Sequence, residues 1–166
     1  MLKYILIASL FQIMSINSCS NVEVATNLEN EILGNWVLKS KFLGDAIDTP
    51  CGYAVKNSKE ITIEIKKEKN NSYAISGQSV VNTYFGSFRI ESTDDKLGIH
   101  FIKIGPILST LMAGPEEFMQ CEKGYFDMLN SVKELNIDKG RLLLGTFKKD
   151  NIPSRDGGTY FIFERK

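Results

Sequence analysis

The chain has 166 residues, in which 20 basic side chains balance 20 acidic ones, and it contains a single histidine. A protein without net charge lacks the positive field on which nucleic-acid binding largely depends, so we expect no nucleic acid among its partners. The length suits one domain that is large enough to bury its own core.

The N-terminus has the pattern of a lipoprotein signal. Lys3 is followed by the apolar run "YILIASLFQIMSI" and then by "NSCS", which contains Cys19. The run is shorter than the roughly 20 residues that a membrane span needs, so the pattern predicts a signal peptide over residues 1–18. A retained anchor helix is the alternative, and Asn17 departs from the small residues that usually precede such a cysteine.

Cleavage would leave Cys19 as the new N-terminus, carrying acyl chains that hold the protein on a bilayer. Residues 19–31 are polar and without periodicity, which predicts a flexible tether, and the folded domain is expected over residues 32–166. Ser20 and Asn21 add no acidic cluster after the cysteine. We therefore expect a lipid-anchored protein of the bacterial cell envelope, on the periplasmic face of the outer membrane.

Two cysteines, Cys51 and Cys121, remain for the domain. In an oxidising compartment such a pair most simply forms a disulfide, although two buried free thiols are also consistent with the sequence. A catalytic thiol is less favoured, because it needs an electropositive site or a helix N-terminus and Cys121 has neither.

The first half of the domain has strand patterns. A first strand is predicted over residues 32–42, where Trp36 and Leu38 point to one side. Residues 61–67 alternate between apolar and polar side chains, which is typical of a strand that is half buried in an antiparallel sheet.

Turns and further strands follow. Asn70 and Asn71 predict one turn and residues 92–98 another. The strand after the second turn has apolar residues on both faces, so it is expected to be covered on both sides. One face carries Leu97, Ile99 and Phe101, and the other carries His100, Ile102 and Ile104. In a packed barrel, the interior would contain Ile63, Phe88, Ile99 and Phe101.

The periodicity changes near Gly114, which can cap a helix. Pro115 suits the first helical position, and Glu116 and Glu117 complement the positive end of the helix dipole. Apolar residues then recur at spacings of three and four, and this stripe is expected to face the sheet. The stripe consists of Phe118, Cys121, Tyr125, Leu129 and Val132. Strand patterns at residues 133–139, 141–147 and 159–166 complete the domain.

Four segments carry a family resemblance: "LGNWVL", "VNTYFGSF", "DDKLGIHFIKIGPILSTLMAGPEEF" and "YFDMLNSVKELNIDKGRLLL". In this order they resemble the META domain family, which includes a heat-inducible bacterial lipoprotein. The matching positions are Asn82, Gly86, Thr110, Met112, Ala113, Pro115, Phe118, Leu129 and Gly140. The resemblance and the patterns above imply an α+β fold, with a mostly antiparallel sheet curled toward a small barrel and one α-helix packed on it. The resemblance implies a non-catalytic role in stress or envelope integrity, through protein contacts or small-ligand binding.

Two positions depart from the family pattern. Val81 and Gly114 stand where members of the family often have cysteines. If those cysteines are bonded in relatives, this chain lacks that bond, and Cys51 with Cys121 would form a different one.

Asn82, Tyr84 and Gly86 form the candidate ligand or turn site. Gly86 is expected to bend a strand at the corner of the barrel. Asn82 is expected to adopt an unusual backbone angle or to bond its own turn. A structural role is favoured at these positions, with the rim of a ligand site as the alternative.

The sequence contains no familiar catalytic motif, so we expect neither an enzyme nor a cofactor. His100 has no partners at metal-binding spacing and is expected to make a local hydrogen bond in its strand. Two acidic pairs are also explained by local structure, since Asp94 and Asp95 lie in a predicted turn, and Glu116 and Glu117 lie at a predicted helix start. These structural roles are favoured over acid–base catalysis.

A lipocalin-like carrier of a small apolar ligand is the alternative function. Gly34, Asn35 and Trp36 resemble the opening of that class. A lipocalin, however, places about eight strands before its helix, whereas about five strand patterns precede the helix in this chain.

Overall fold

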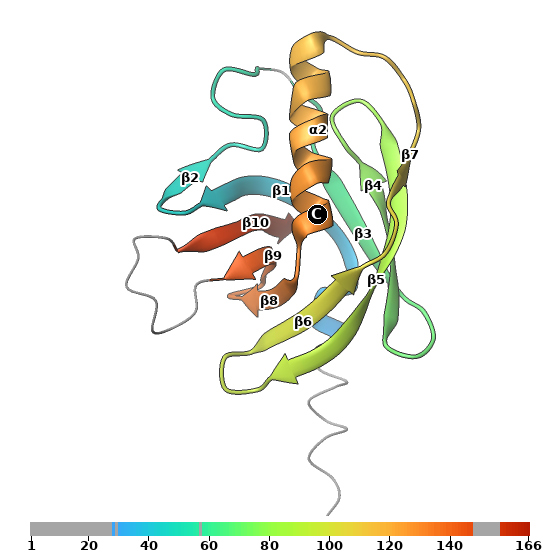
Figure 1. The fold of residues 1–166 in the computed structure, drawn as a ribbon, viewed down its shortest axis with the longest axis vertical. Helices are drawn as coiled ribbons and strands as arrows, with labels where there is room; N and C mark the ends of the chain where they lie inside the picture. Colours follow the sequence, from blue (N-terminus) through green and yellow to red (C-terminus); the bar gives the residue numbers. More distant parts are fainter. Residues whose placement is uncertain (1–27, 29, 57, 148–156) are drawn as a thin grey trace, which may run out of the picture.

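The computed structural model describes residues 28, 30–56, 58–147 and 157–166. Cys19, the predicted signal peptide and most of the predicted tether lie outside the described residues. No helix in the described part of the chain is long and apolar enough to cross a membrane. Figure 1 shows a strongly curved sheet with one main helix, α2 (Glu116–Ser131), packed across it.

The sheet is antiparallel throughout. Its strands are β1 (Gly34–Leu43), β2 (Ala46–Asp48), β3 (Thr62–Lys67), β4 (Ser72–Gln78), β5 (Thr83–Asp94), β6 (Ile99–Ile104), β7 (Leu108–Ser109), β8 (Glu134–Asp138), β9 (Arg141–Phe147) and β10 (Gly158–Arg165). Within the described residues, β10 pairs with β1 and so closes a barrel of eight strands. β2 pairs with the second half of β1, and β7 pairs with the first residues of β5, so both lie outside the closed ring.

The predicted α+β class, a mostly antiparallel sheet curled into a small barrel with one helix packed on it, is confirmed. In the described chain, β1, β3, β4, β5 and β6 precede α2, and β8, β9 and β10 follow it. The helix therefore interrupts the barrel, whereas a lipocalin completes its barrel first.

The core follows from the alternation of side chains along the strands. Ile61, Ile63 and Ile65 are buried because they share the inner face of the β3 segment, while their polar neighbours face outward. Tyr125 and Leu129 of α2 are buried against the same core. The largest fully buried side chains of this core include Trp36, Tyr73, Tyr84, Phe161 and Phe163. Burial of each large apolar side chain contributes about 1.5–3 kcal/mol to folding.

One expectation about β6 is wrong. Ile99 and Phe101 were expected inside the barrel, yet they are only half buried, whereas His100 and Ile102 are buried. Ile102 lies opposite Ile90, which packs against the core, and cross-strand partners share a face of the sheet. Because both faces of β6 are apolar, alternation alone could not choose the inner one.

The turns follow their residue types. Asn70 and Asn71 have φ angles of 55° and 57°, in the left-handed region that asparagine tolerates, and they form the predicted turn between β3 and β4. Lys139 and Gly140, with φ angles of 52° and 75°, form the turn between β8 and β9.

A disulfide joins α2 to the loop between β2 and β3. It connects Cys51 and Cys121, whose Cα atoms are 5.0 Å apart and which are 70 residues apart in sequence. The predicted pair therefore lies at bonding distance, and Val81 and Gly114 take no part in it. Closing a loop of this length stabilises a fold by roughly 4 kcal/mol in the chain-entropy model.

Candidate functional site

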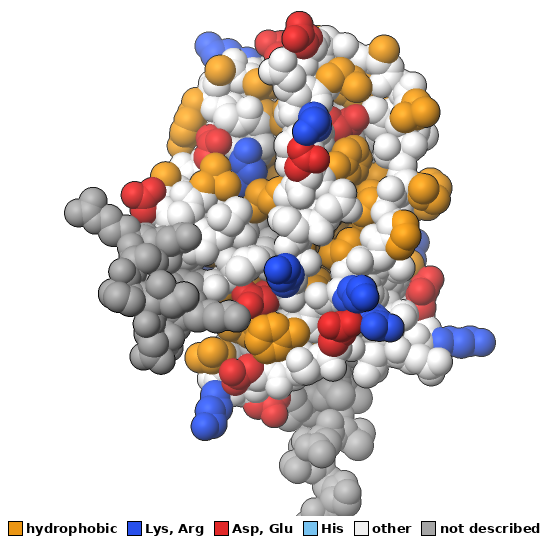
Figure 2. All heavy atoms as spheres, in the orientation of Figure 1, with side chains coloured by type: hydrophobic (Ala, Val, Ile, Leu, Met, Phe, Trp, Pro, Cys, Tyr) orange, Lys and Arg blue, Asp and Glu red, His pale blue; other side chains and the backbone are white. Residues whose placement is uncertain are grey.

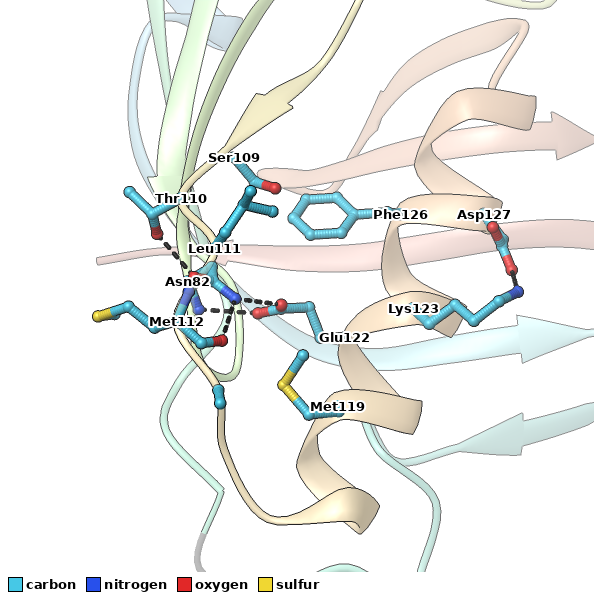
Figure 3. A pocket seen from close by; sticks show the side chains of 11 residues that line it. Asn82, Ser109, Thr110, Leu111, Met112, Met119, Glu122, Lys123, Phe126 and Asp127 are labelled. Carbon is cyan, nitrogen blue, oxygen red and sulfur yellow. Dashed lines mark hydrogen bonds and ion pairs between the residues drawn. The ribbon is translucent and has the colours of Figure 1, made fainter.

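Glu122 is the charged residue that α2 buries most deeply, with 5% of its surface exposed. It follows Cys121 on the helix, and it faces the turn between β4 and β5 rather than solvent (Figure 3). A carboxylate at such a position must be compensated by hydrogen bonds, because burial of an unpaired charge is costly.

The β4–β5 turn supplies that compensation. The carboxylate of Glu122 accepts hydrogen bonds from the backbone N–H of Val81 at 3.0 Å and from that of Asn82 at 2.8 Å. It also accepts bonds from the hydroxyl of Ser79 and, at 2.6 Å, from Nδ2 of Asn82. Burial raises the pKa of Glu122, but the donors on Ser79, Asn82 and Val81 outweigh it and hold the pKa below its ordinary value. Glu122 is therefore ionised at neutral pH.

Asn82 connects this carboxylate to a third segment, residues 108–113. Its Oδ1 accepts hydrogen bonds from Oγ1 of Thr110 and from the backbone N–H of Met112, both at 2.7 Å. Its Nδ2 also donates to the carbonyl of Met112 at 3.2 Å. One buried side chain thus holds together the β4–β5 turn, the segment after β7 and α2, as Figure 3 shows.

The role predicted for Asn82 is therefore only partly right. It does take part in its own turn, because its carbonyl accepts a hydrogen bond from the backbone N–H of Ser79 at 2.7 Å and its own backbone N–H is 3.3 Å from Oγ of Ser79. Its backbone, however, is outside the left-handed region. The side chain makes its bonds to distant segments, which sequence spacing does not reveal.

Tyr84 belongs to the barrel interior. It is buried, its hydroxyl donates to the carbonyl of Thr62 at 3.0 Å, and it lies 2.6 Å from the hydroxyl of Tyr125. Burial raises the pKa of Tyr84 far above its ordinary value, so the phenol stays neutral. The contact of Tyr84 with Tyr125 joins β5 to α2. Tyr84 does not line the surface groove described below.

Gly86 is required for close packing. A Cβ atom at this position would lie 2.5 Å from Cδ1 of Ile107 and 3.0 Å from the carbonyl of Pro106. Gly86 pairs regularly with Ile75 and its φ angle is not positive, so the close packing explains the glycine, and the bend predicted at this residue stays a prediction. The register shift of β5 occurs later, between Ile90 and Ser92.

The two positions that lack the family's cysteines touch each other. A Cβ atom on Gly114 would lie 2.9 Å from Cγ2 of Val81 and 3.7 Å from its Cβ. The valine side chain therefore occupies the space beside Gly114, and it packs the segment before α2 against the β4–β5 turn.

A groove of about 440 Å³ opens beside this network, between residues 109–113 and α2. Apolar walls are supplied by Leu111, Met112 and Ala113 on one side and by Met119 and Phe126 on the other. An ion pair between Lys123 and Asp127, 2.6 Å long, lies on the helix side. Asn82 and Glu122 also line the groove.

The rim of the groove exposes large apolar side chains. Leu111 is 97% exposed and Met112 is more than half exposed; Phe85 and Leu108, on the adjoining β5–β7 pair, are also more than half exposed. Figure 2 shows hydrophobic side chains gathered beside α2, on the side of β7. Single exposed apolar residues are common on protein surfaces, but a cluster of them beside a groove is typical of binding sites.

The remaining candidates lie elsewhere and have local partners. His100 Nδ1 is 2.8 Å from Oγ1 of Thr93, and burial lowers the pKa of the imidazole. Asp94 accepts hydrogen bonds from the backbone N–H groups of Lys96 and Leu97, which stabilises their turn. In the described residues, no group of three or more histidine, cysteine or acidic side chains is arranged to hold a metal ion.

Glu122 is the site residue that the sequence patterns missed. It has one available signal: it lies three residues before Tyr125 and four after Phe118, within the width of the apolar stripe. An acidic residue in such a stripe predicts a buried partner, although the sequence does not identify that partner as the turn at residues 79–82.

Comparison with known proteins identifies the family of this chain. The META domain model matches residues 28–156. A solution structure of a protein from Burkholderia xenovorans matches with a TM-score of 0.52 and 19% identity, and the match covers 96% of this chain and 99% of that one. This likeness supports the fold alone. No curated protein sequence matches the chain. The family match covers most of the domain, and the chain belongs to the META domain family.

Proposed function

We propose that this META domain protein is a non-catalytic binding protein of the bacterial envelope. It acts through the groove beside α2, which holds a protein segment or a small ligand in a stress or envelope-integrity role. The observation that carries the proposal is the exposed rim of the groove, where Leu111 projects almost entirely into solvent. An apolar side chain that is so exposed lowers the solubility of the protein. Contact with a partner would explain why this side chain is exposed.

The chemistry of the groove floor favours binding over catalysis. Glu122 accepts four hydrogen bonds from the protein, and its lowered pKa disfavours proton uptake near neutral pH. Both polar groups of the Asn82 amide are likewise bonded to the protein. These groups hold the wall of the groove in position rather than attack a substrate.

The filling of the barrel disfavours the alternative, a lipocalin-like carrier. Such a carrier holds its apolar ligand inside the barrel, where this chain packs Trp36, Tyr73, Phe161 and Phe163. A ligand would therefore bind on the outside of the barrel, between α2 and residues 109–113.

The membrane anchor is a separate part of the proposal. We expect Cys19→Ser to release the protein from membranes, because the acyl chains would be lost. Fractionation of cells that express the wild type or the variant checks this, with metabolic labelling of the lipid as a second measurement. A Cys19→Ser protein that stays in the membrane fraction would contradict the anchor.

The role of the groove is tested in a strain from which the gene has been deleted. We expect the deletion to increase entry of a hydrophobic dye through the envelope under heat stress. The wild type should restore the barrier, whereas Leu111→Asp should not, because a charge on the rim opposes an apolar contact. Leu97→Asp is the matched control, since Leu97 is 56% exposed at the turn between β5 and β6.

Equal rescue by Leu111→Asp and Leu97→Asp would show that the groove has no part in the function. Immunoblots of membrane fractions confirm that both variants accumulate to the level of the wild type. If Leu111→Asp alone accumulates to a lower level, its failure to rescue could come from poor folding. Rescue is therefore compared at matched protein levels.

A further inference from the structure

β7 has a free edge. Tyr84 lies opposite Ser109, and the backbone N–H of Thr110 donates to the carbonyl of Thr83 at 3.0 Å. In an antiparallel pair, successive residues point their N–H and C=O groups alternately toward the partner strand and away from it. The N–H and C=O of Ser109 therefore point away from β5. Across the described residues, no strand pairs with β7 on that second edge.

This edge borders the groove. Ser109 lines the groove, and Phe126 of α2 lies across from it in Figure 3. On the other face of the β5–β7 pair, Leu108 lies opposite Phe85, and both side chains are exposed. A strand added beside β7 would thus meet backbone hydrogen-bonding groups at its edge and apolar side chains on both of its faces.

The chain enters the domain at a point that lies away from the groove. Arg165 donates to the backbone carbonyls of Asn30, Glu31 and Leu33, at 3.3, 2.6 and 3.1 Å, and so fixes the entering chain. Figure 1 shows this entry at one end of the long axis, whereas the first turns of α2 and the segment after β7 lie toward the other end. The groove therefore lies toward the end of the domain opposite to the entering chain.

We infer that the groove receives an extended segment of another protein, which pairs with the free edge of β7. This inference rests on the proposed function and names the class of its partner. Backbone bonds to Ser109 contribute affinity that is independent of sequence, and alternate side chains of the segment contact Met119 and Phe126. The chemistry selects apolar residues at every second position of the partner. A lipid or a small apolar ligand lacks the backbone N–H and C=O groups that those of Ser109 complement.

The experiment uses the full mature chain, purified in detergent, and a defined set of peptide probes. Overlapping 12-residue peptides from the exported proteins of the source organism are displayed as an array, and the tightest binder is synthesised. Two further versions of this peptide carry N-methyl groups on alternate amides, one version for each edge of the extended peptide. Methylation removes backbone donors from the edge concerned and leaves every side chain unchanged.

Three variants separate edge pairing from apolar contact. Ser109→Pro removes the free N–H but no bond to β5, and Leu108 is already extended, as a residue before proline must be. Leu111→Asp alters the apolar rim, and Leu97→Asp is the distant control. Circular dichroism and urea unfolding verify that each variant is folded.

We expect Ser109→Pro and Leu111→Asp each to weaken peptide binding about tenfold or more, and Leu97→Asp to leave it unchanged. N-methylation on one of the two edges should weaken binding to a similar degree. If Leu111→Asp weakens binding while Ser109→Pro and both methylated peptides bind normally, the groove binds by apolar contact alone. That result overturns strand addition and leaves the proposed function standing.

Two other results overturn the inference. If no peptide binds the wild type more tightly than it binds Leu111→Asp, both the strand addition and the proposed role of the groove fail. If light scattering shows a dimer that Ser109→Pro converts to a monomer, the free edge pairs with a second copy of the chain. The occupant would then not be another protein.

Discussion

The barrel interior and the surface groove share α2 as a wall, yet they differ in almost every physical respect. On the interior side, Leu129 is fully buried in a core that includes aromatic residues from several strands. On the groove side, Phe126 is only half buried, and Leu111 opposite is 97% exposed. The interior contributes stability through burial, whereas the groove leaves apolar surface in water. This difference is what the proposed binding role of the groove requires.

A polar network separates the two regions. Glu122 and Asn82 bond to each other, to the β4–β5 turn and to the backbone of Met112, so they fix the distance between the groove walls. Towards the interior, α2 makes a side-chain hydrogen bond through the hydroxyl pair of Tyr84 and Tyr125. The groove wall is thus held by hydrogen bonds, while the barrel is held mainly by apolar packing.

The largest effect is expected from a matched pair of leucine truncations. Leu129→Ala should lower the free energy of unfolding by about 3 kcal/mol, because it leaves a cavity in a packed core. Leu111→Ala should change it by less than about 0.5 kcal/mol, because the side chain is already in water. Urea denaturation measures both. Equal losses would mean that Leu111 is buried in solution and that the rim of the groove is not exposed.

The next largest effect is expected at the polar network. Glu122→Ala should cost about 2 kcal/mol, because the donors of Ser79, Val81 and Asn82 would be left without an acceptor in a buried site. Glu117→Ala is the control on the same helix, at an exposed position, and should cost less than about 0.5 kcal/mol. Urea midpoints compare the two variants. A loss of stability at Glu122 no greater than at Glu117 would show that the polar network does not stabilise the fold.

A smaller, stabilising effect is expected from the double variant Val81→Cys, Gly114→Cys. The Cβ separation of 3.7 Å at these positions is close to the average of about 3.8 Å found in disulfides. A second disulfide should form and raise the free energy of unfolding by about 1 kcal/mol, because lost valine packing offsets part of the entropic gain. Thiol alkylation and mass spectrometry detect the bond. Recovery of both new cysteines in alkylated form would contradict the observed contact between the two segments.

Much of the fold could be predicted, because its signals are local. The alternation at Ile61, Ile63 and Ile65 fixes the inner face of its strand, and the spacing of Tyr125 and Leu129 fixes the face of α2 that packs on the sheet. The inner face of β6 could not be predicted, because both of its faces are apolar and the pairing with β5 decides between them.

The candidate site was harder to predict, because its contacts join residues that are far apart in sequence. Asn82 and Gly86 were recognised as special residues, but their partners, Glu122 and Ile107, come from segments that only the folded barrel brings near. The close approach of Ile107 to Gly86 was missed for the same reason. A glycine that allows close approach of another segment looks, in sequence, like a glycine that allows a turn.

The central claim is that a partner binds in the groove and not inside the barrel. Site-specific photo-crosslinking in intact cells tests it most directly, with benzoylphenylalanine placed at Leu111 or, as the control, at Leu97. The account predicts a discrete adduct from position 111, absent at position 97 and lost when Met119→Asp is added to the groove wall. Identical adducts from both positions, or an adduct at 111 that survives Met119→Asp, would contradict it.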